Sequence, residues 1–270
     1  MSIRLDAVAG QFYPSNPKEI ESMVHHYNDI LDKNIDMNTL ESKDTRSVIV
    51  PHAGYIYSAF TANIAIRMLG AKNPKSITVI GPSHRVYLSG VSLCDYDRFE
   101  TPLGDLKIDR PVVEMLKSEF GLRMVSEAHH EHSTEVQMPL IKYYMPDTSV
   151  VELVCGDVDP DVLSIIIEKL LNDPNKAVVI STDLSHYYDI DKANRLDAIC
   201  LEAIDYLDRL RLHQGCEACG KIGVEAMIVA AKNLSLKPEI LDYRTSADAS
   251  QDKTQVVGYA SAAFIKEDKG

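Results

Sequence analysis

The chain has 270 residues, of which 45% are hydrophobic and 25% are charged, and these values are ordinary for a globular protein. Its formal net charge of −12 provides no cationic field that would attract phosphate groups. This charge argues against a nucleic-acid partner and against binding to an anionic membrane, although a local basic pocket for one phosphate group stays compatible with it.

The apolar and cysteine residues favour a cytoplasmic protein. No apolar run approaches the roughly 18 residues that a membrane-spanning helix needs, and the first residues lack the apolar core of a signal peptide. The five cysteines stand at positions 94, 155, 200, 216 and 219. With no secretory signal, we expect reduced thiols, and we interpret Cys216 and Cys219 as a structural thiol pair because no second CxxC completes a zinc site.

Periodicity predicts helices and short apolar strands that alternate along the chain. In chain order, we expect a helix at 16–34, a strand at 46–50, a helix at 58–70, a strand at 76–80, a hairpin excursion within 87–108, helices at 111–119 and 135–145, a strand at 148–155, a helix at 160–172, a strand at 176–181, helices at 190–212 and 220–233, and a strand at 257–265.

This alternation indicates an α/β fold with a mostly parallel or mixed central sheet and helices on both faces. No repeat or linker-like stretch interrupts the chain, so we expect a single domain over residues 1–270. In open sheets of this kind, ligands bind in the crevice at the carboxyl ends of the strands.

Two histidines follow core strands directly. His52 stands in "VPHAGY" after the strand at 46–50, and His84 stands in "GPSHR" after the strand at 76–80. Each could be a turn histidine whose ring bonds a backbone carbonyl. Two units of the same form favour a functional reading, because a neutral imidazole is the commonest metal ligand at pH 7.

The segment "STDLSHYYD" places Asp183 and His186 after the strand at 176–181. One turn of helix would bring these two side chains to the same side. Helix capping explains one of the polar residues here, but it leaves His186 without a role. A histidine at this rim could orient or protonate a bound substrate.

The segment "SEAHHEHSTEVQMPL" at 126–140 is the densest group of ionisable residues. We expect His132 to project towards the rim behind the metal ligands, and Glu135 is a weaker candidate. His129 and His130 are expected at the surface. A solvated loop is the alternative for the whole segment.

A third metal ligand is needed if His52 and His84 hold a metal ion, and Asp248 in "TSADASQDKTQVVGYAS" is the favoured source. Two histidines with one carboxylate leave the open positions that are typical of non-haem Fe(II) sites. Zinc sites with three protein ligands and a water are similar, so this ligand set does not select the metal.

Seven motifs, in order along nearly the whole chain, resemble the Memo family. They are "AGQFYPSNP", "VPHAGYIYS", "GPSHR", "EHSTEVQMPLI", "STDLSHYYD", "CG" at 219–220 and "VVGYASAAF". The resemblance implies a single three-layer α/β domain, similar to that of class III extradiol dioxygenases, which use non-haem iron.

The resemblance also implies a metal pocket at His52 and His84, lined by Asp183 and His186. The third ligand position lies in the loop before the last strand, where eukaryotic members carry a cysteine and the dioxygenases a glutamate. This chain offers Asp248 there, with Asp252 as a rival.

The leading hypothesis is therefore a metal-binding, dioxygenase-like oxidoreductase that acts on a small organic substrate. Fe(II) is the expected ion, with Zn or Cu as alternatives, and His186, Asp183 and His132 would handle protons. A zinc hydrolase with Glu135 or Asp183 as base is one alternative. A binding module for an anionic or phosphorylated peptide beside Arg85, and a purely structural metal site, are the others.

Overall fold

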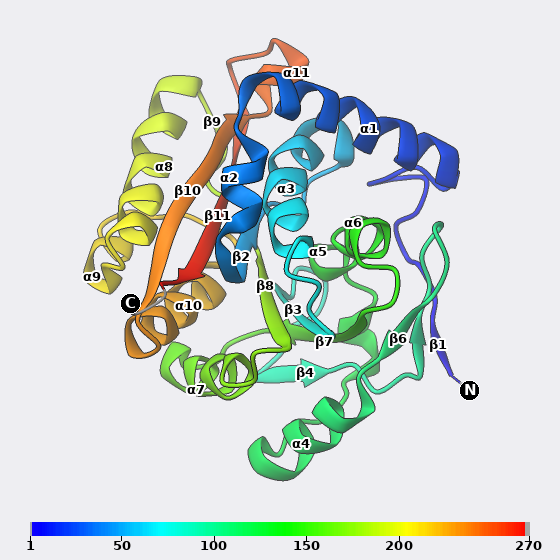
Figure 1. The fold of residues 1–270 in the computed structure, drawn as a ribbon. Coiled ribbons are helices and arrows are strands. Elements are labelled where there is room, and N and C mark those ends of the chain that lie inside the picture. Colours follow the sequence, from blue (N-terminus) through cyan, green and yellow to red (C-terminus); the bar gives the residue numbers. More distant parts are fainter. Residues whose placement is uncertain (1, 268–270) are drawn as a thin grey trace.

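The computed structural model describes residues 2–267, and its strands form one mixed sheet with helices on both faces (Figure 1). The strands are β1 (Ile3–Arg4), β2 (Asp44–Val50), β3 (Ser76–Pro82), β4 (Val91–Leu93), β5 (Arg98–Phe99), β6 (Leu106–Ile108), β7 (Ser149–Cys155), β8 (Lys176–Ser181), β9 (His186–Tyr188), β10 (Leu236–Thr245) and β11 (Val256–Lys266). The helices are α1 (Pro17–Asn34), α2 (Met37–Ser42), α3 (Tyr55–Gly70), α4 (Arg110–Phe120), the 3₁₀ turn η1 (Ser126–His129), α5 (His132–Glu135), α6 (Met138–Tyr144), α7 (Pro160–Leu171), α8 (Ile190–Asp205), α9 (Arg209–Leu212), α10 (Lys221–Asn233) and α11 (Ala247–Ser250).

Four parallel strands form the centre of the sheet. Within the described residues the order is β1-β5-β6-β7-β3-β8-β2-β11-β10, and β4 and β9 pair with β7 and β11. The neighbours β7, β3, β8 and β2 all run parallel, whereas β10 and β11 are antiparallel. The carboxyl ends of the four central strands therefore lie at one edge of the sheet, and the residues that follow them share one rim.

Apolar side chains on both faces of the central strands hold the layers together. Val48, Ile49 and Val50 of β2 are completely buried, as are Val178 and Val179 of β8. Burial on both sides is the reason why these strands are nearly all apolar instead of alternating. On one side, α3 packs on β2, β10 and β11, and on the other, α7, α8 and α10 cover the sheet (Figure 1).

The five predicted strands are all present, within two residues at each end. The expected three-layer α/β fold with a mixed sheet is confirmed. Strand β10 was not predicted, because its sequence "LKPEILDYRT" is polar and contains Pro238, as suits an edge strand that pairs only with β11. The predicted helix at 190–212 is broken into α8 and α9, because Leu207 adopts a left-handed φ of 50° and Asp208 caps the second helix.

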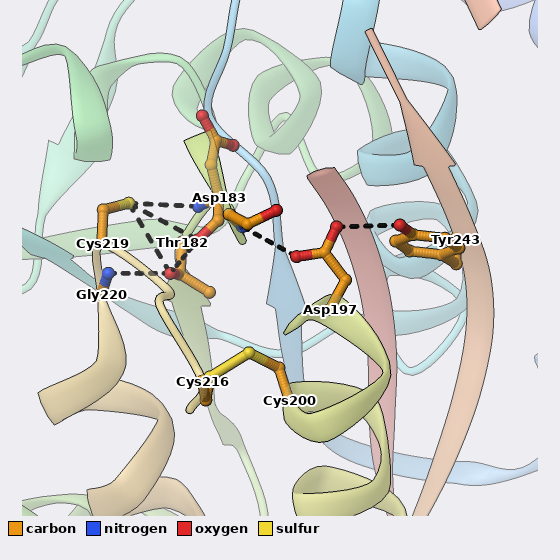
Figure 2. Close-up of a disulfide and its surroundings, with 9 residues drawn as sticks. Thr182, Asp183, Asp197, Cys200, Cys216, Cys219, Gly220 and Tyr243 are labelled. Atoms are coloured by element: carbon orange, nitrogen blue, oxygen red, sulfur yellow. Dashed lines mark hydrogen bonds between the residues drawn. A yellow bond between two sulfur atoms is a disulfide. The ribbon is translucent and has the colours of Figure 1, made fainter. Parts of the chain in front are cut away.

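A disulfide joins Cys200 of α8 to Cys216 in the loop before α10 (Figure 2). The expectation that all five cysteines are reduced, with Cys216 and Cys219 as a thiol pair, is therefore wrong. Cys94, Cys155 and Cys219 are free. Within residues 2–267, no helix has the length and apolar character to cross a membrane, and the cytoplasmic location stays a prediction.

Candidate metal centre at the strand ends

Three histidines converge at the rim. His52 follows β2, His84 follows β3 and His132 begins α5, and one ring nitrogen from each lies within 4.8 Å of the others. The ring centroids are 5.2 Å apart for His52 and His84, and 4.7 Å apart for His84 and His132. The prediction that the two strand ends bring His52 and His84 together agrees with this geometry. His132 lies beside them in the same group instead of behind them.

Glu131 anchors two of these rings. Its carboxylate accepts the backbone N–H groups of His84 and His132 at 2.6 and 2.8 Å, and its Oε1 lies 3.2 Å from Nδ1 of His84. Nδ1 of His132 is 2.8 Å from the same oxygen, close enough for charge pairing but not aligned as a hydrogen bond. Burial opposes ionisation, but the contacts with His132 and His84 outweigh it and hold the pKa of Glu131 well below its ordinary value. An ionised carboxylate thus occupies the Nδ1 side of both rings and leaves each Nε2 available.

His52 is oriented by a serine network. Its Nδ1 lies 3.0 Å from Oγ of Ser181, which donates its own proton to the carbonyl of Ser133 and accepts from Nε2 of Gln137. Since the serine proton is already committed, Nδ1–H of His52 must be the donor in that contact. Burial, helped by His84 and His132, lowers the pKa of His52 well below its ordinary value, so the ring is neutral and its Nε2 carries a lone pair.

Cys219 contacts that same Nε2 atom. Its Sγ lies 3.3 Å from Nε2 of His52. The same sulfur accepts the backbone N–H of Asp183 at 3.3 Å (Figure 2). Burial, with the nearby Asp183, raises the pKa of the Cys219 thiol to about 12, so the group is a neutral thiol at pH 7. The sequence singled out Cys219 only as part of "CG" and of the CxxC pair; its place at the rim was missed.

Asp183 and His186 flank the group without joining it. Asp183 accepts the backbone N–H of His52 at 2.8 Å, and burial raises the pKa of its carboxyl to about 7. The helical turn expected to link the two residues is absent: His186 opens β9, and Asp197 of α8 fixes the connection by accepting the N–H of Ser185. His186 is half-buried, and burial lowers its pKa.

The expected third ligand, Asp248, is not brought to the histidines. It lies in the short helix α11, where its carboxylate accepts the backbone N–H of Thr245 at 2.8 Å, and it lines a separate cavity beside Tyr57 and Phe60. Its rival Asp252 is exposed and accepts from Thr254. Both carboxylates close local turns, and neither belongs to the group of metal-binding type that the described residues place around His52. His132, and not Asp248, is the third ligand-type side chain beside His52 and His84.

A second group of ligand-type side chains lies inside the core. Cys94, His129 and Glu152 are all buried and place one ligand atom each within 4.8 Å of the others. The surface position expected for His129 is wrong, whereas His130 is exposed as expected. Both ring nitrogens of His129 are already engaged, Nδ1 by Glu152 at 2.7 Å and Nε2 by Oγ of Ser92 at 2.8 Å. This group therefore has no free imidazole lone pair to offer.

Glu135 belongs to the same interior and not to the rim. Its carboxylate pairs with Arg4 and accepts from the N–H groups of Ala7 and Val8 and from the hydroxyl of Tyr13. These contacts attach the amino-terminal segment to α5. The role of general base that the sequence allowed for Glu135 is thus not available in this geometry.

The rim donors suit a divalent transition metal. Three imidazoles are a donor set that zinc, copper, iron and nickel accept, and each ring has a protein partner on its Nδ1 side. The set differs from the expected two histidines and one carboxylate. The geometry therefore fits a metal, while the change of the third donor weakens the specific preference for Fe(II).

Comparisons with known proteins agree with the motifs. A family model described as "Memo-like protein" matches residues 4–263. A "MEMO1 family protein" of Sulfolobus acidocaldarius is 34% identical over 97% of this chain and 99% of its own length. A second, from Saccharolobus islandicus, is 32% identical over 97% of this chain and 99% of its own.

One solved structure resembles the fold. An uncharacterised protein from Escherichia coli K12 superposes with a TM-score of 0.52 at 12% identity, over 80% of this chain and 99% of its own. At this identity the likeness concerns the fold alone.

Proposed function

The chain belongs to the Memo family, and we propose that within this fold it is a metal-dependent enzyme whose centre is formed by His52, His84 and His132. The leading version is an oxidoreductase that uses Fe(II) and acts on a small organic substrate. The observation that carries the proposal is the common orientation of the rings: their Nδ1 sides face Glu131 or Ser181, which leaves Nε2 of His84 and His132 for a ligand, whereas Nε2 of His52 contacts the thiol of Cys219.

A metal bound there would act as a Lewis acid, and iron or copper would also allow electron transfer. The residues of the chain supply the rest. Glu131 fixes two rings and compensates the positive charge that a metal brings, because its carboxylate is buried and ionised. Asp183 holds the backbone of His52, and the thiol of Cys219 contacts the Nε2 atom of the same ring.

A zinc hydrolase is the second candidate, and the position of Asp248 favours it. Three histidines without a carboxylate form the ligand set of zinc sites that activate a water molecule. This candidate uses the same residues, so metal identity and oxygen dependence separate the two.

The first experiment is metal analysis of untagged protein purified without oxygen, using plasma mass spectrometry. The variants His52→Ala, His84→Ala and His132→Ala are each expected to lose the metal. Asp248→Ala is the matched control and should keep it, because its carboxylate lies in α11. Thermal unfolding of each variant verifies that the fold is intact.

Near-stoichiometric iron that disappears in the three histidine variants supports the oxidoreductase. Zinc in its place, with activity that needs no oxygen, supports the hydrolase. No metal in the wild type, and none taken up on addition of Fe(II) or Zn²⁺, overturns both versions.

A further inference from the structure

A cavity of about 250 Å³ adjoins the histidine group on the far side of His52. It opens between the carboxyl ends of β3, β7 and β8 and the start of α10. Its walls are apolar side chains and glycine backbone, among them Ile80, Cys155, Ile180 and Ile222. Neither the family resemblance nor the metal centre explains why the fold leaves this space.

Close backbone packing connects the cavity to the metal centre. A side chain at Gly220 would place its Cβ 2.8 Å from the carbonyl oxygen of Ser181, so only glycine lets the start of α10 approach the end of β8. This approach brings Cys219 into the cavity wall beside Ser181. The same two side chains touch His52, at 3.3 Å from its Nε2 and 3.0 Å from its Nδ1.

The charge of the walls selects against anions. Among the residues that line the cavity, Asp157 alone carries a formal charge, and it is exposed at the mouth with Tyr87. No Lys or Arg of the lining could compensate a carboxylate or a phosphate group. Burying an unpaired anion in such a site costs several kcal/mol, whereas an apolar body is favoured.

The volume limits the size of the ligand. A dry apolar cavity of about 150 Å³ holds benzene, which has six non-hydrogen atoms. By proportion, 250 Å³ accommodates roughly ten non-hydrogen atoms, the size of one substituted ring. A peptide of several residues would exceed the space.

We propose that this cavity binds a small, uncharged, largely apolar molecule of the size of one substituted ring, with one end against Cys219 and Ser181. The binding depends only on the cavity, whereas the role of the ligand as substrate rests on the proposed metal-dependent function.

The probe is para-fluorobenzyl alcohol, followed by fluorine NMR with the full chain, both as purified and after removal of metal with a chelator. Its matched anion is para-fluorobenzoate, which has almost the same shape. We expect the alcohol to bind in both preparations, and the benzoate to bind at least about tenfold more weakly because of its unpaired charge.

Variants of residues that line the cavity test whether the alcohol binds inside it. Val86 is half-buried in the segment after β3 and lines the cavity, so Val86→Trp should fill the mouth and weaken the alcohol roughly tenfold or more. Val86→Ala is the matched control and should retain binding. Ile222→Trp fills the space from the opposite wall and serves if Val86→Trp lowers the melting temperature strongly.

The inference is supported if chelated protein and His84→Ala still bind the alcohol while the variants that fill the cavity lose it. This result would hold even if the metal proposal fails. Absence of binding in wild type overturns the inference. Equal binding of the benzoate, or unchanged binding in both filling variants, overturns it as well, since the probe would then sit elsewhere.

Discussion

Two groups of similar side chains, one at the rim and one in the core, differ in what their histidines are left to do. At the rim, Glu131 lies on the Nδ1 side of His84 and His132 and leaves their Nε2 atoms open, whereas His52 contacts Ser181 through Nδ1 and the thiol of Cys219 through Nε2. In the core, His129 is engaged at both ring nitrogens, and Arg4 lies 3.7 Å from the carboxylate of Glu152. The residue types alone would make both groups candidate metal sites. The engaged ring nitrogens of His129 suit the core group to a structural network, and the open Nε2 atoms of His84 and His132 suit the rim to the proposed metal site.

The largest expected effect comes from removing Arg4, the cation that pairs with the buried carboxylates of Glu135 and Glu152. Arg4→Ala leaves the carboxylates of Glu135 and Glu152 buried without their cation, and the free energy of unfolding should fall by about 3–5 kcal/mol. Urea denaturation followed by circular dichroism measures it. Arg98→Ala is the matched control: this arginine pairs with Asp105 at the surface, and its loss should cost about 1 kcal/mol or less. Equal losses in the two variants would contradict the assignment of Arg4.

The next effect comes from the disulfide between Cys200 and Cys216. Replacing Cys200 and Cys216 together by Ala opens a loop with a sequence separation of 16 residues, and the free energy of unfolding should fall by about 3 kcal/mol. Wild type treated with a reductant should fall to the same level, whereas the double variant should not respond. Five titratable thiols in unreduced, denatured wild type would show that the bond does not form.

A pair of isosteric changes separates the two groups by metal affinity. Glu131→Gln removes the ionised carboxylate behind His84 and His132, and metal affinity should fall about 10–100-fold. Glu152→Gln should leave metal affinity unchanged while it lowers stability. Competition with a chromogenic chelator measures both. If Glu152→Gln lost metal to the same extent, the distinction between rim and core would fail.

The smallest effect is a pH dependence of the core group. Burial opposes ionisation of Glu152, but Arg4 and His129 outweigh it and lower its pKa. A lowered pKa contributes stability above the ordinary glutamate pKa of about 4.3, and this contribution is lost as pH falls below that value towards the folded pKa. Glu152→Gln cannot titrate, so its stability should fall less steeply, by up to about 1.4 kcal/mol per pH unit, in urea titrations between about pH 3 and 5. Parallel curves for variant and wild type would argue against an ionised Glu152.

The positions of His52 and His84 are the part of the candidate site that the sequence predicts. His52 and His84 follow apolar runs that are unmistakable as buried strands, and parallel strands must bring their carboxyl ends together. His132 was identified as near the rim but not as a member of the group, because the position of a four-residue helix depends on tertiary contacts such as those of Glu131.

The remaining differences between the predicted and the observed site come from tertiary contacts, which the local sequence pattern does not encode. The sequence favours Asp248 because a metal ion at His52 and His84 needs a third ligand. In α11, however, the carboxylate of Asp248 accepts the backbone N–H of Thr245. The partner of Cys216 is 16 residues away on α8, while the nearer Cys219 turns to His52. His129 looked like one of two adjacent polar histidines, and only the packing of η1 against β7 buries it.

The ion pairs of Arg4 also bear on the order in which the chain can fold. Arg4 stands 131 residues before Glu135 and further still before Glu152, so during synthesis it emerges long before either partner exists. Until then its guanidinium lacks both carboxylates, and closing so long a loop is slow. We therefore expect the strand β1 and the segment that leads to Phe12, whose ring packs on His132 at 4.5 Å, to join the molecule late. We also expect assembly of the rim to wait for Ser181 and Cys219, which contact His52 from the second half of the chain.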